Sequence, residues 1–138
     1  MPSTLIDTNV LVDVLEKRLD WADWVLRQFT KLAADGDLVI NQIVYGEASV
    51  PYSSLEAFDQ ALQEGWMRRE DLPWEAAFIA GKVHQSYRSK GGVKSSVLPD
   101  FLIGAHAQFR GYRVLTRDPA GFRTYFPDVE IIAPDTHP

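Results

Sequence analysis

Short apolar runs, separated by longer stretches of helical periodicity, are the feature of this 138-residue chain that most constrains its fold. The runs that predict strands are Leu5–Ile6, Leu38–Ile40, Tyr112–Thr116 and Val129–Ile132, with a short edge strand within Met67–Leu72. Strands that alternate with helices are typical of an α/β fold with a mainly parallel sheet. We therefore expect a single α/β domain.

Apolar residues at three- and four-residue steps predict the helices between these strands. The predicted helices are Val10–Leu15, Trp21 to Gly36, Ile43–Val50, one from Ser53 or Ser54 towards Trp66 with Gly65 near its end, Pro73 to Gly91, and Pro99 to Gly111. The last is apolar on almost all sides, so we expect it to be central and buried. Thr8 or Asn9 is expected to cap the first helix. Residues 93–98 are expected to form a surface loop with Lys94 and two serines.

The composition limits the compartment and the chemistry. There is no cysteine, which excludes disulfide bonds and thiolate metal sites and fits a reducing compartment. No apolar run reaches the roughly 18 residues of a membrane span, and the N-terminus lacks the features of a signal peptide. We therefore expect a cytoplasmic protein without a membrane partner.

The net charge of −5 is unevenly distributed along the chain. Residues 1–81 carry 6 basic and 14 acidic side chains, whereas residues 82–138 carry 8 basic and 5 acidic ones. A negative total argues against a nucleic-acid partner, because phosphate binding requires Lys and Arg. An acidic site flanked by a basic segment can nevertheless hold metal ions and attract a phosphate backbone.

Four carboxylates occupy comparable places in the predicted fold. Asp7 ends the first strand, Glu47 lies in the helix after the second, Asp100 opens the buried helix, and Asp118 follows the strand that ends near Thr116. The carboxyl ends of parallel strands share one edge of the sheet, so all four are candidates for one cleft. Taken singly, each aspartate could equally be a turn or cap residue.

Such a cluster requires compensation. Two carboxylates about 5 Å apart at an effective dielectric constant near 20 repel each other by roughly 3 kcal/mol. A divalent cation with oxygen ligands, such as Mg²⁺, relieves this repulsion. A bound cation of this kind also lowers the pKa of its water, which is the chemistry of metal-assisted phosphodiester hydrolysis.

Four segments that span nearly the whole chain resemble the motifs of the PIN domain family, and within it the VapC-like ribonuclease toxins of type II toxin–antitoxin pairs. They are Leu5–Leu11 (LIDTNVL), Asn41–Glu47 (NQIVYGE), Pro99–Ala107 (PDFLIGAHA), and Leu115–Asp118 (LTRD) with Phe122–Pro127. The resemblance implies a three-layer α/β/α PIN domain over residues 1–135, with residues 136–138 as a tail. His106, where small residues are common in the family, is a minor departure.

The resemblance also implies an activity and its partners. It implies an endoribonuclease dependent on Mg²⁺ or Mn²⁺, in which Asp7 and Asp100 bind the metal directly. Asp118 would bind it often through water, and Glu47 would be a ligand or orient a water. The resemblance further implies a homodimer that is inhibited by a VapB-like antitoxin, whose contacts we expect on the apolar faces of residues 21–32 and 55–66.

Other polar residues have supporting or structural interpretations. Asn9 and Thr116 are expected to hold the acids in place. The candidates for contact with the RNA backbone are Arg117, Lys94, Lys90 and Arg88. Asp13 is expected on a solvated helix face, and His84 and His106 are expected to be packed or surface residues rather than general bases. Trp21, Trp24 and Trp74 are expected in the core or in an interface.

Two other functions stay open from the sequence. One is a PIN-fold module that cleaves little and binds a partner protein or RNA, although the presence of all four acids favours the enzyme. The other is an aspartyl-phosphate phosphatase with Asp7 as nucleophile, which is disfavoured because it would require a second acid at Asn9.

Overall fold

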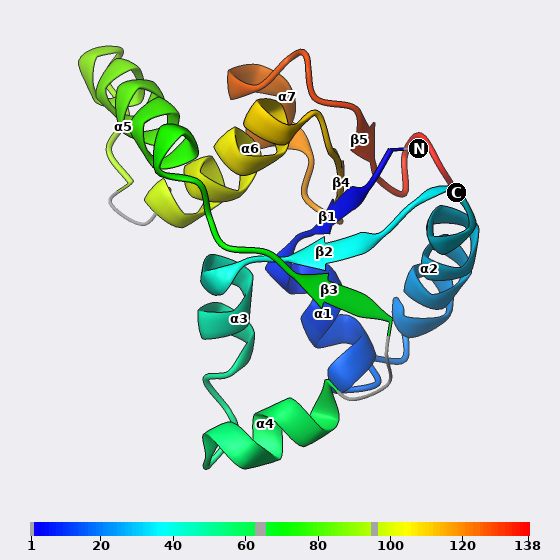
Figure 1. Cartoon of the computed structure of the whole chain (residues 1–138). Helices are drawn as coiled ribbons and strands as arrows, with labels where there is room; N and C mark the ends of the chain where they lie inside the picture. Colours follow the sequence, from blue (N-terminus) through cyan, green and yellow to red (C-terminus); the bar gives the residue numbers. More distant parts are fainter. Residues whose placement is uncertain (1, 63–65, 95–96) are drawn as a thin grey trace.

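The computed structural model describes residues 2–62, 66–94 and 97–138, and its centre is a five-stranded sheet (Figure 1). The strands are β1 (Thr4–Ile6), β2 (Leu38–Ile40), β3 (Met67–Arg69), β4 (Arg113–Leu115) and β5 (Ile131–Ile132). All neighbours pair in parallel, in the order β3-β2-β1-β4-β5. In this register Leu5 pairs with Val39 on one side and with Val114 on the other. The predicted parallel α/β sheet is therefore confirmed.

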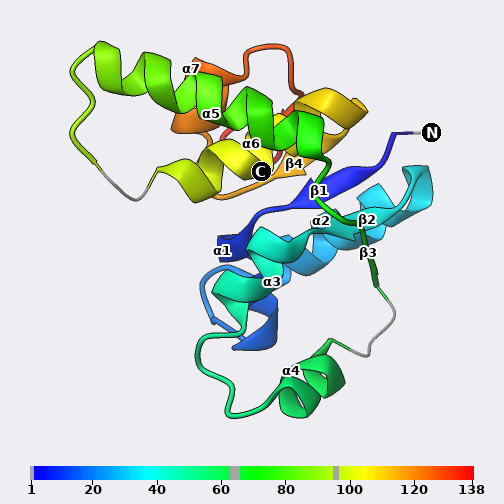
Figure 2. The same cartoon turned by 60° about the vertical axis from the view of Figure 1, so that its left-hand side comes forward.

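Helices cover both faces of the sheet, which gives the expected three layers. They are α1 (Thr8–Leu15), α2 (Ala22–Asp35), α3 (Gln42–Ala48), α4 (Leu55–Ala61), α5 (Trp74–Ser89), α6 (Leu98–Arg110) and α7 (Ala120–Tyr125). Figure 2 shows α1 to α4 on one side of the sheet and α5, α6 and α7 on the other. No described helix has both the length and the apolar character that a membrane crossing demands.

The core explains why the middle residues of the central strands are apolar. Leu5, Val39 and Val114 have no exposed surface, because the strands of a parallel sheet are covered on both faces. Helix α6 is buried as predicted, and the glycine in its middle allows a close approach. A Cβ atom on Gly104 would lie 2.4 Å from the ring of Phe126. Helix α6 therefore packs directly against the C-terminal segment.

Several boundaries differ from the predictions. The cap of α1 is Asp7 rather than Thr8 or Asn9, because the helix begins directly after β1 and the Asp7 carboxylate accepts a hydrogen bond from the Thr8 N–H at 2.8 Å. Strand β3 ends at Arg69, and α4 ends at Ala61, short of Trp66. Gly65, which is predicted near the end of this helix, lies outside the described residues, as do the two serines of the 93–98 loop.

Candidate metal centre

Asp7 lies at the carboxyl end of β1, where hydrogen bonds fix both of its carboxylate oxygens. Oδ1 accepts from the Thr8 N–H, and Oδ2 accepts from the hydroxyl of Thr116 at 2.7 Å and from Nδ2 of Asn9 at 3.3 Å. Nδ2 of Asn9 also lies 3.4 Å from the Thr116 hydroxyl. The structure therefore places Asn9 and Thr116 beside Asp7, with Thr116 following β4 at the same edge of the sheet.

The other three candidate acids reach this edge from separate elements. Glu47 projects from α3, and its Oε1 accepts a 2.6 Å hydrogen bond from the hydroxyl of Thr8. Asp100 lies in the first turn of α6. Asp118 follows β4, and its N–H donates to the Thr116 hydroxyl at 3.0 Å. Asp100 and Asp118 line the same cavity.

The mutual influence of these charges is visible in their pKa values. Burial raises the pKa of Asp7 to about 6; the Thr116 hydrogen bond opposes this rise, and the charges of Asp100 and Glu47 add to it. Burial also raises the pKa of Asp100, and the charges of Glu47 and Asp118 raise it further. Asp7 is therefore influenced by the charges of Asp100 and Glu47, and Asp100 by those of Glu47 and Asp118.

The chemistry of these donors suits a hard divalent cation. Within residues 2–62, 66–94 and 97–138, no three acidic or histidine side chains are arranged to hold a metal ion as they stand. Mg²⁺ does not require such a cage, because it keeps several of its own waters and commonly uses one or two carboxylates together with a substrate phosphate. The excess negative charge around the buried Asp7 is the feature that a cation would balance.

A partly buried ion pair holds the segment that carries Asp118. Asp13 has no exposed surface, and Arg117 binds it through Nε at 2.5 Å and through Nη2 at 3.1 Å. The guanidinium also lies 5.1 Å from the ring centre of Trp21, and the Arg117 N–H donates to Oδ1 of Asn9 at 3.2 Å. The expectation of a solvated Asp13 is wrong, because this side of α1 faces the segment after β4.

The ion pair also bears on the candidate RNA contacts. The guanidinium of Arg117 is engaged by Asp13, so a phosphate contact through it would compete with this pair. Lys94, Lys90 and Arg88 are exposed at the end of α5 and just beyond it. Contact of these three side chains with an RNA backbone therefore stays a proposal.

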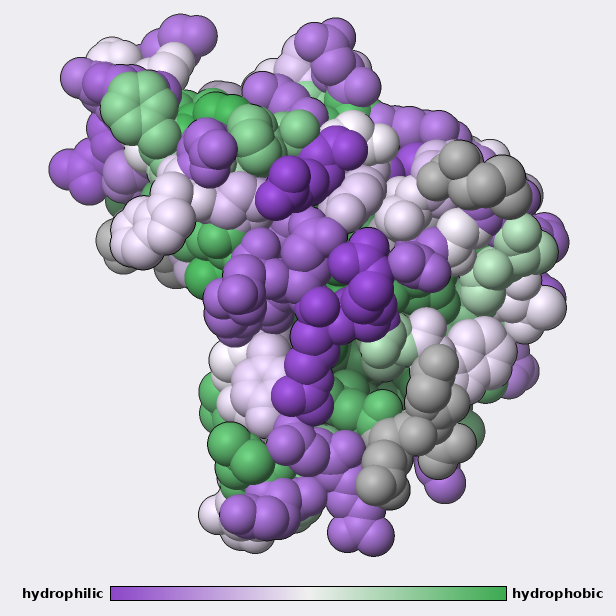
Figure 3. All heavy atoms as spheres, in the orientation of Figure 1, coloured by the Kyte–Doolittle hydropathy of each residue, from purple (hydrophilic) through white to green (hydrophobic). Residues whose placement is uncertain are grey.

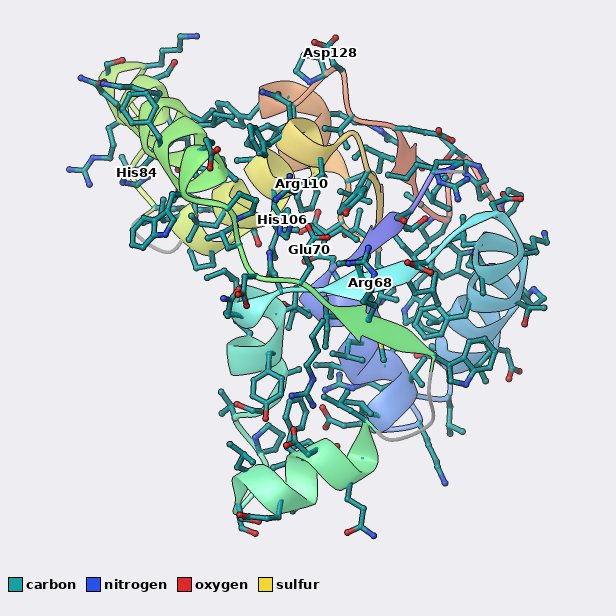
Figure 4. All side chains as sticks on the ribbon, in the orientation of Figure 1. Arg68, Glu70, His84, His106, Arg110 and Asp128 are labelled. Atoms are coloured by element: carbon teal, nitrogen blue, oxygen red, sulfur yellow. The ribbon has the colours of Figure 1, made fainter. Side chains whose placement is uncertain are left out.

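A second polar cluster, which the sequence did not reveal, lies at the carboxyl ends of β2 and β3. Asn41 caps α3 through Oδ1, which accepts from the N–H groups of Ile43 and Val44. Its Nδ2 therefore donates to Nδ1 of the fully buried His106 at 3.0 Å. The imidazole proton is then on Nε2, which donates to Oε2 of Glu70 at 2.6 Å. Figure 4 shows Glu70 and His106 facing each other, with His84 apart.

Glu70 accepts several hydrogen bonds in this cluster. Its Oε1 accepts from the hydroxyl of Tyr112 at 2.6 Å and from Nη1 of Arg68 at 2.9 Å. Burial alone would raise the pKa of Glu70, but the hydrogen bonds from Tyr112, His106 and Arg68 outweigh it and lower the pKa to about 2. Burial lowers the pKa of His106, which favours the neutral ring. The cluster therefore ties the start of α3 to the middle of α6.

The surface over this cluster is polar. In the space-filling view of Figure 3, hydrophilic side chains form a band across the β3 edge of the sheet. Arg68 and Arg69 are exposed there, and Arg68 also donates to Asp37 at 2.9 Å. This edge strand is covered by charge, which disfavours pairing with a further strand.

The Glu70→Gln substitution is expected to weaken the acid dependence of stability. The pKa of Glu70 is about 2 in the folded protein and 4.5 in a model compound, so the unfolded chain binds the proton more readily. The stabilisation from this carboxylate is therefore fully present above about pH 4.5 and is lost as the pH falls towards 2. Urea unfolding of both proteins at about pH 7, 5 and 3.5 measures this difference.

The control for this measurement is Glu75→Gln, because Glu75 is an exposed glutamate of α5. The stability difference between the wild type and Glu70→Gln should narrow as the pH falls, whereas the control should follow the wild type. An equal difference at all three pH values would contradict the low pKa of Glu70.

The fold and the acidic edge define a class: a single α/β domain whose open parallel sheet presents carboxylates where its strands end. The family model described as PIN domain matches residues 4–126, so the chain belongs to the PIN domain family. The resemblance noted in the sequence is thereby confirmed. A comparison with curated proteins finds no match by sequence.

Solved structures of the same fold come from toxin–antitoxin complexes. VapBC2 from Rickettsia felis, bound to a DNA fragment from its promoter, has a chain with 19% identity and a TM-score of 0.75, with 95% of this chain and 98% of that chain covered. DNA-bound VapBC from Salmonella typhimurium has a chain with 21% identity and a TM-score of 0.73, with 96% of this chain and 98% of that chain covered. FitAcB from Neisseria gonorrhoeae has a chain with 21% identity and a TM-score of 0.70, with 94% of this chain and 96% of that chain covered.

Proposed function

We propose that this protein is a metal-dependent endoribonuclease that acts as the toxin of a type II toxin–antitoxin pair. The observation that carries the proposal is the convergence of Asp7, Glu47, Asp100 and Asp118, from four separate elements, at the carboxyl edge of the sheet. The pKa of Asp7 near 6 supports it, because burial, together with the charges of Asp100 and Glu47, disfavours the ionised carboxylate in a way that a bound cation would reverse.

In this proposal Asp7 and Asp100 bind Mg²⁺ or Mn²⁺ directly, Asp118 binds through water, and Glu47 is a ligand or orients a water. The cation, when bound, supplies a water of lowered pKa and a positive charge beside the scissile phosphate. Thr116 and Asn9 keep the Asp7 carboxylate in one orientation through their hydrogen bonds to Oδ2.

The remaining parts of the proposal concern substrate and partners. Lys94, Lys90 and Arg88 lie in the basic C-terminal half and would attract the RNA backbone. The neighbouring structures include a toxin–antitoxin complex, which supports a VapB-like antitoxin as partner. The apolar face expected for this contact on residues 21–32 lies in the core, where Trp24, Val25 and Phe29 are buried, so we propose the contact on the second expected face, at the exposed Leu55 of α4. We also propose a homodimer.

Removal of the metal provides the first test. We expect the purified protein to cleave single-stranded RNA in Mg²⁺ or Mn²⁺, to lose this activity in EDTA, and to regain it when Mg²⁺ is restored. Gel analysis of a labelled RNA measures the cleavage. The Asp128→Asn variant serves as a matched control, because Asp128 is an exposed acid that precedes β5 and lines a cavity with Pro2 and Gly111, at the opposite edge of the sheet from the candidate metal centre. Full cleavage in EDTA would overturn the metal-dependent mechanism.

The alternative is a PIN-fold module that cleaves little and binds a partner protein or RNA. Expression in a bacterial host separates the two functions. A nuclease toxin should arrest growth, and Asp7→Asn should relieve the arrest. Arrest that persists in the variant, with RNA bound but uncleaved in vitro, would favour the binding module.

A further inference from the structure

A cavity of about 270 Å³ opens among α5, α6 and α7, directly beside two of the candidate metal ligands. Figures 1 and 2 both show α5 lying along α6, with α7 next to α6. Asp100 and Asp118 form one side of the cavity, and most of the remaining wall is aromatic. The aromatic lining residues are Tyr87, Phe101, Phe122, Tyr125 and Phe126. Whatever enters this cavity therefore lies next to the acidic edge.

The aromatic side chains hold one another in place. The ring centres of Tyr87 and Phe101 are 5.7 Å apart, those of Phe101 and Tyr125 are 5.0 Å apart, and those of Tyr87 and Tyr125 are 5.9 Å apart. All three pairs meet edge to face, an arrangement that stabilises aromatic clusters. Phe101 is buried, whereas Tyr87 and Tyr125 are half-buried. The two tyrosines therefore offer ring surface to the cavity in fixed positions.

One basic side chain, that of Lys94, lines the cavity. Lys94 is exposed, and its backbone N–H donates to the hydroxyl of Tyr87 at 3.1 Å. Within the described residues, no carboxylate lies within ion-pair distance of Lys94. A positive charge is therefore available beside an aromatic wall and close to the acids.

We propose that this cavity binds one nucleobase of a single-stranded RNA. The nucleotide that carries this base would lie next to the phosphodiester bond that is cleaved at the carboxylate site. This inference rests on the proposed nuclease function and adds a base-binding site to it. A nucleobase is flat and can stack on tyrosine, while the phosphate of its nucleotide can reach Lys94. An aliphatic peptide side chain would fill the apolar part but would leave Lys94 without a partner. The combined chemistry favours a nucleotide.

A fluorescent base provides the test. A short oligoribonucleotide that contains 2-aminopurine is titrated with the full-length protein in EDTA, where the proposed cleavage cannot proceed. We expect binding to quench the fluorescence, because the base stacks on an aromatic ring. Tyr87→Leu and Tyr125→Leu should each weaken binding by about tenfold, the loss typical of one stacked base. Tyr125→Phe should bind like the wild type, since it keeps the ring.

Two further variants guard against effects on folding. Lys94→Gln changes only an exposed side chain, and it should lower the affinity and weaken its dependence on salt. Phe109→Leu removes a partly exposed aromatic residue of α6 that does not line the cavity, and it should bind like the wild type. In Mg²⁺, the two leucine variants should raise KM by a similar factor while kcat changes less than about twofold.

The outcomes separate the two proposals. Equal quenching by the wild type and both leucine variants would overturn the base site, even if the protein cleaves RNA. If quenching depends on the tyrosines but the protein does not cleave RNA under any tested condition, the base-binding site would be supported and the proposed nuclease activity would be rejected. Loss of quenching in Tyr125→Phe as well as in Tyr125→Leu would also contradict stacking.

Discussion

The Asp100→Asn variant is expected to lose RNA cleavage by about 100-fold or more and, at the same time, to be more stable than the wild type without metal. The loss follows because the proposed metal contributes several kcal/mol of charge stabilisation to the transition state. The gain follows because the pKa of Asp100 is raised in the fold by burial and by the charges of Glu47 and Asp118. At neutral pH its ionised form therefore opposes folding.

Cleavage assays and thermal unfolding, each with and without Mg²⁺, measure the two effects. Mg²⁺ should stabilise the wild type and should stabilise Asp100→Asn less. Asp100 is more informative here than Asp7, because a change at Asp7 also disturbs its bonds to Thr8 and Thr116. Asp128→Asn should match the wild type in both assays. An Asp100→Asn protein that is less stable than the wild type in EDTA would contradict the charge repulsion.

The arrangement of the sheet could be predicted because its signals are local. Four of the five strands contain buried apolar residues, such as Leu5 and Val114, and a predicted helix follows each of the first three strands. Asp7 and Asp118, which follow two of these runs, had to share one edge. The choice of cap for α1 could not be predicted, since Asp7, Thr8 and Asn9 are all good capping residues, and only the direct junction of β1 and α1 selects Asp7.

Most of the side-chain hydrogen bonds and ion pairs of Glu70 and Asp13 join residues that are far apart in the sequence. They are therefore hard to predict from the sequence. Glu70 and His106 are 36 residues apart, and Glu70 lies in a segment without clear periodicity. Arg117 and Asp13 are 104 residues apart. One signal was present: Asp13 lies three residues after the buried Val10 and hence on the same side of the helix. A charged residue on a core-facing side predicts a buried partner, although the pattern does not identify which one.

That partner makes Arg117→Ala the variant with the largest expected loss of stability. Removal of one member of a buried ion pair typically costs about 3–5 kcal/mol, and we expect the lower end here, because Arg117 is 27% exposed whereas Asp13 would stay buried without compensation. Asp13 has no exposed surface, and both guanidinium contacts to it would be lost. The contact between the guanidinium and Trp21 would be lost as well. Urea unfolding at neutral pH measures the change.

Arg123→Ala is the matched control, because Arg123 also binds an aspartate through two nitrogens, at 2.7 and 2.8 Å from Asp135, but on the surface. Its loss should change stability little, since water screens exposed pairs. The double variant Asp13→Leu/Arg117→Met should regain most of the stability lost in Arg117→Ala, because it leaves no unpaired charge in the core. Equal losses in Arg117→Ala and Arg123→Ala would mean that the unpaired Asp13 is not what destabilises the protein. Weak cleavage by a stable double variant would instead show that the pair serves mainly to hold Asp118 in place.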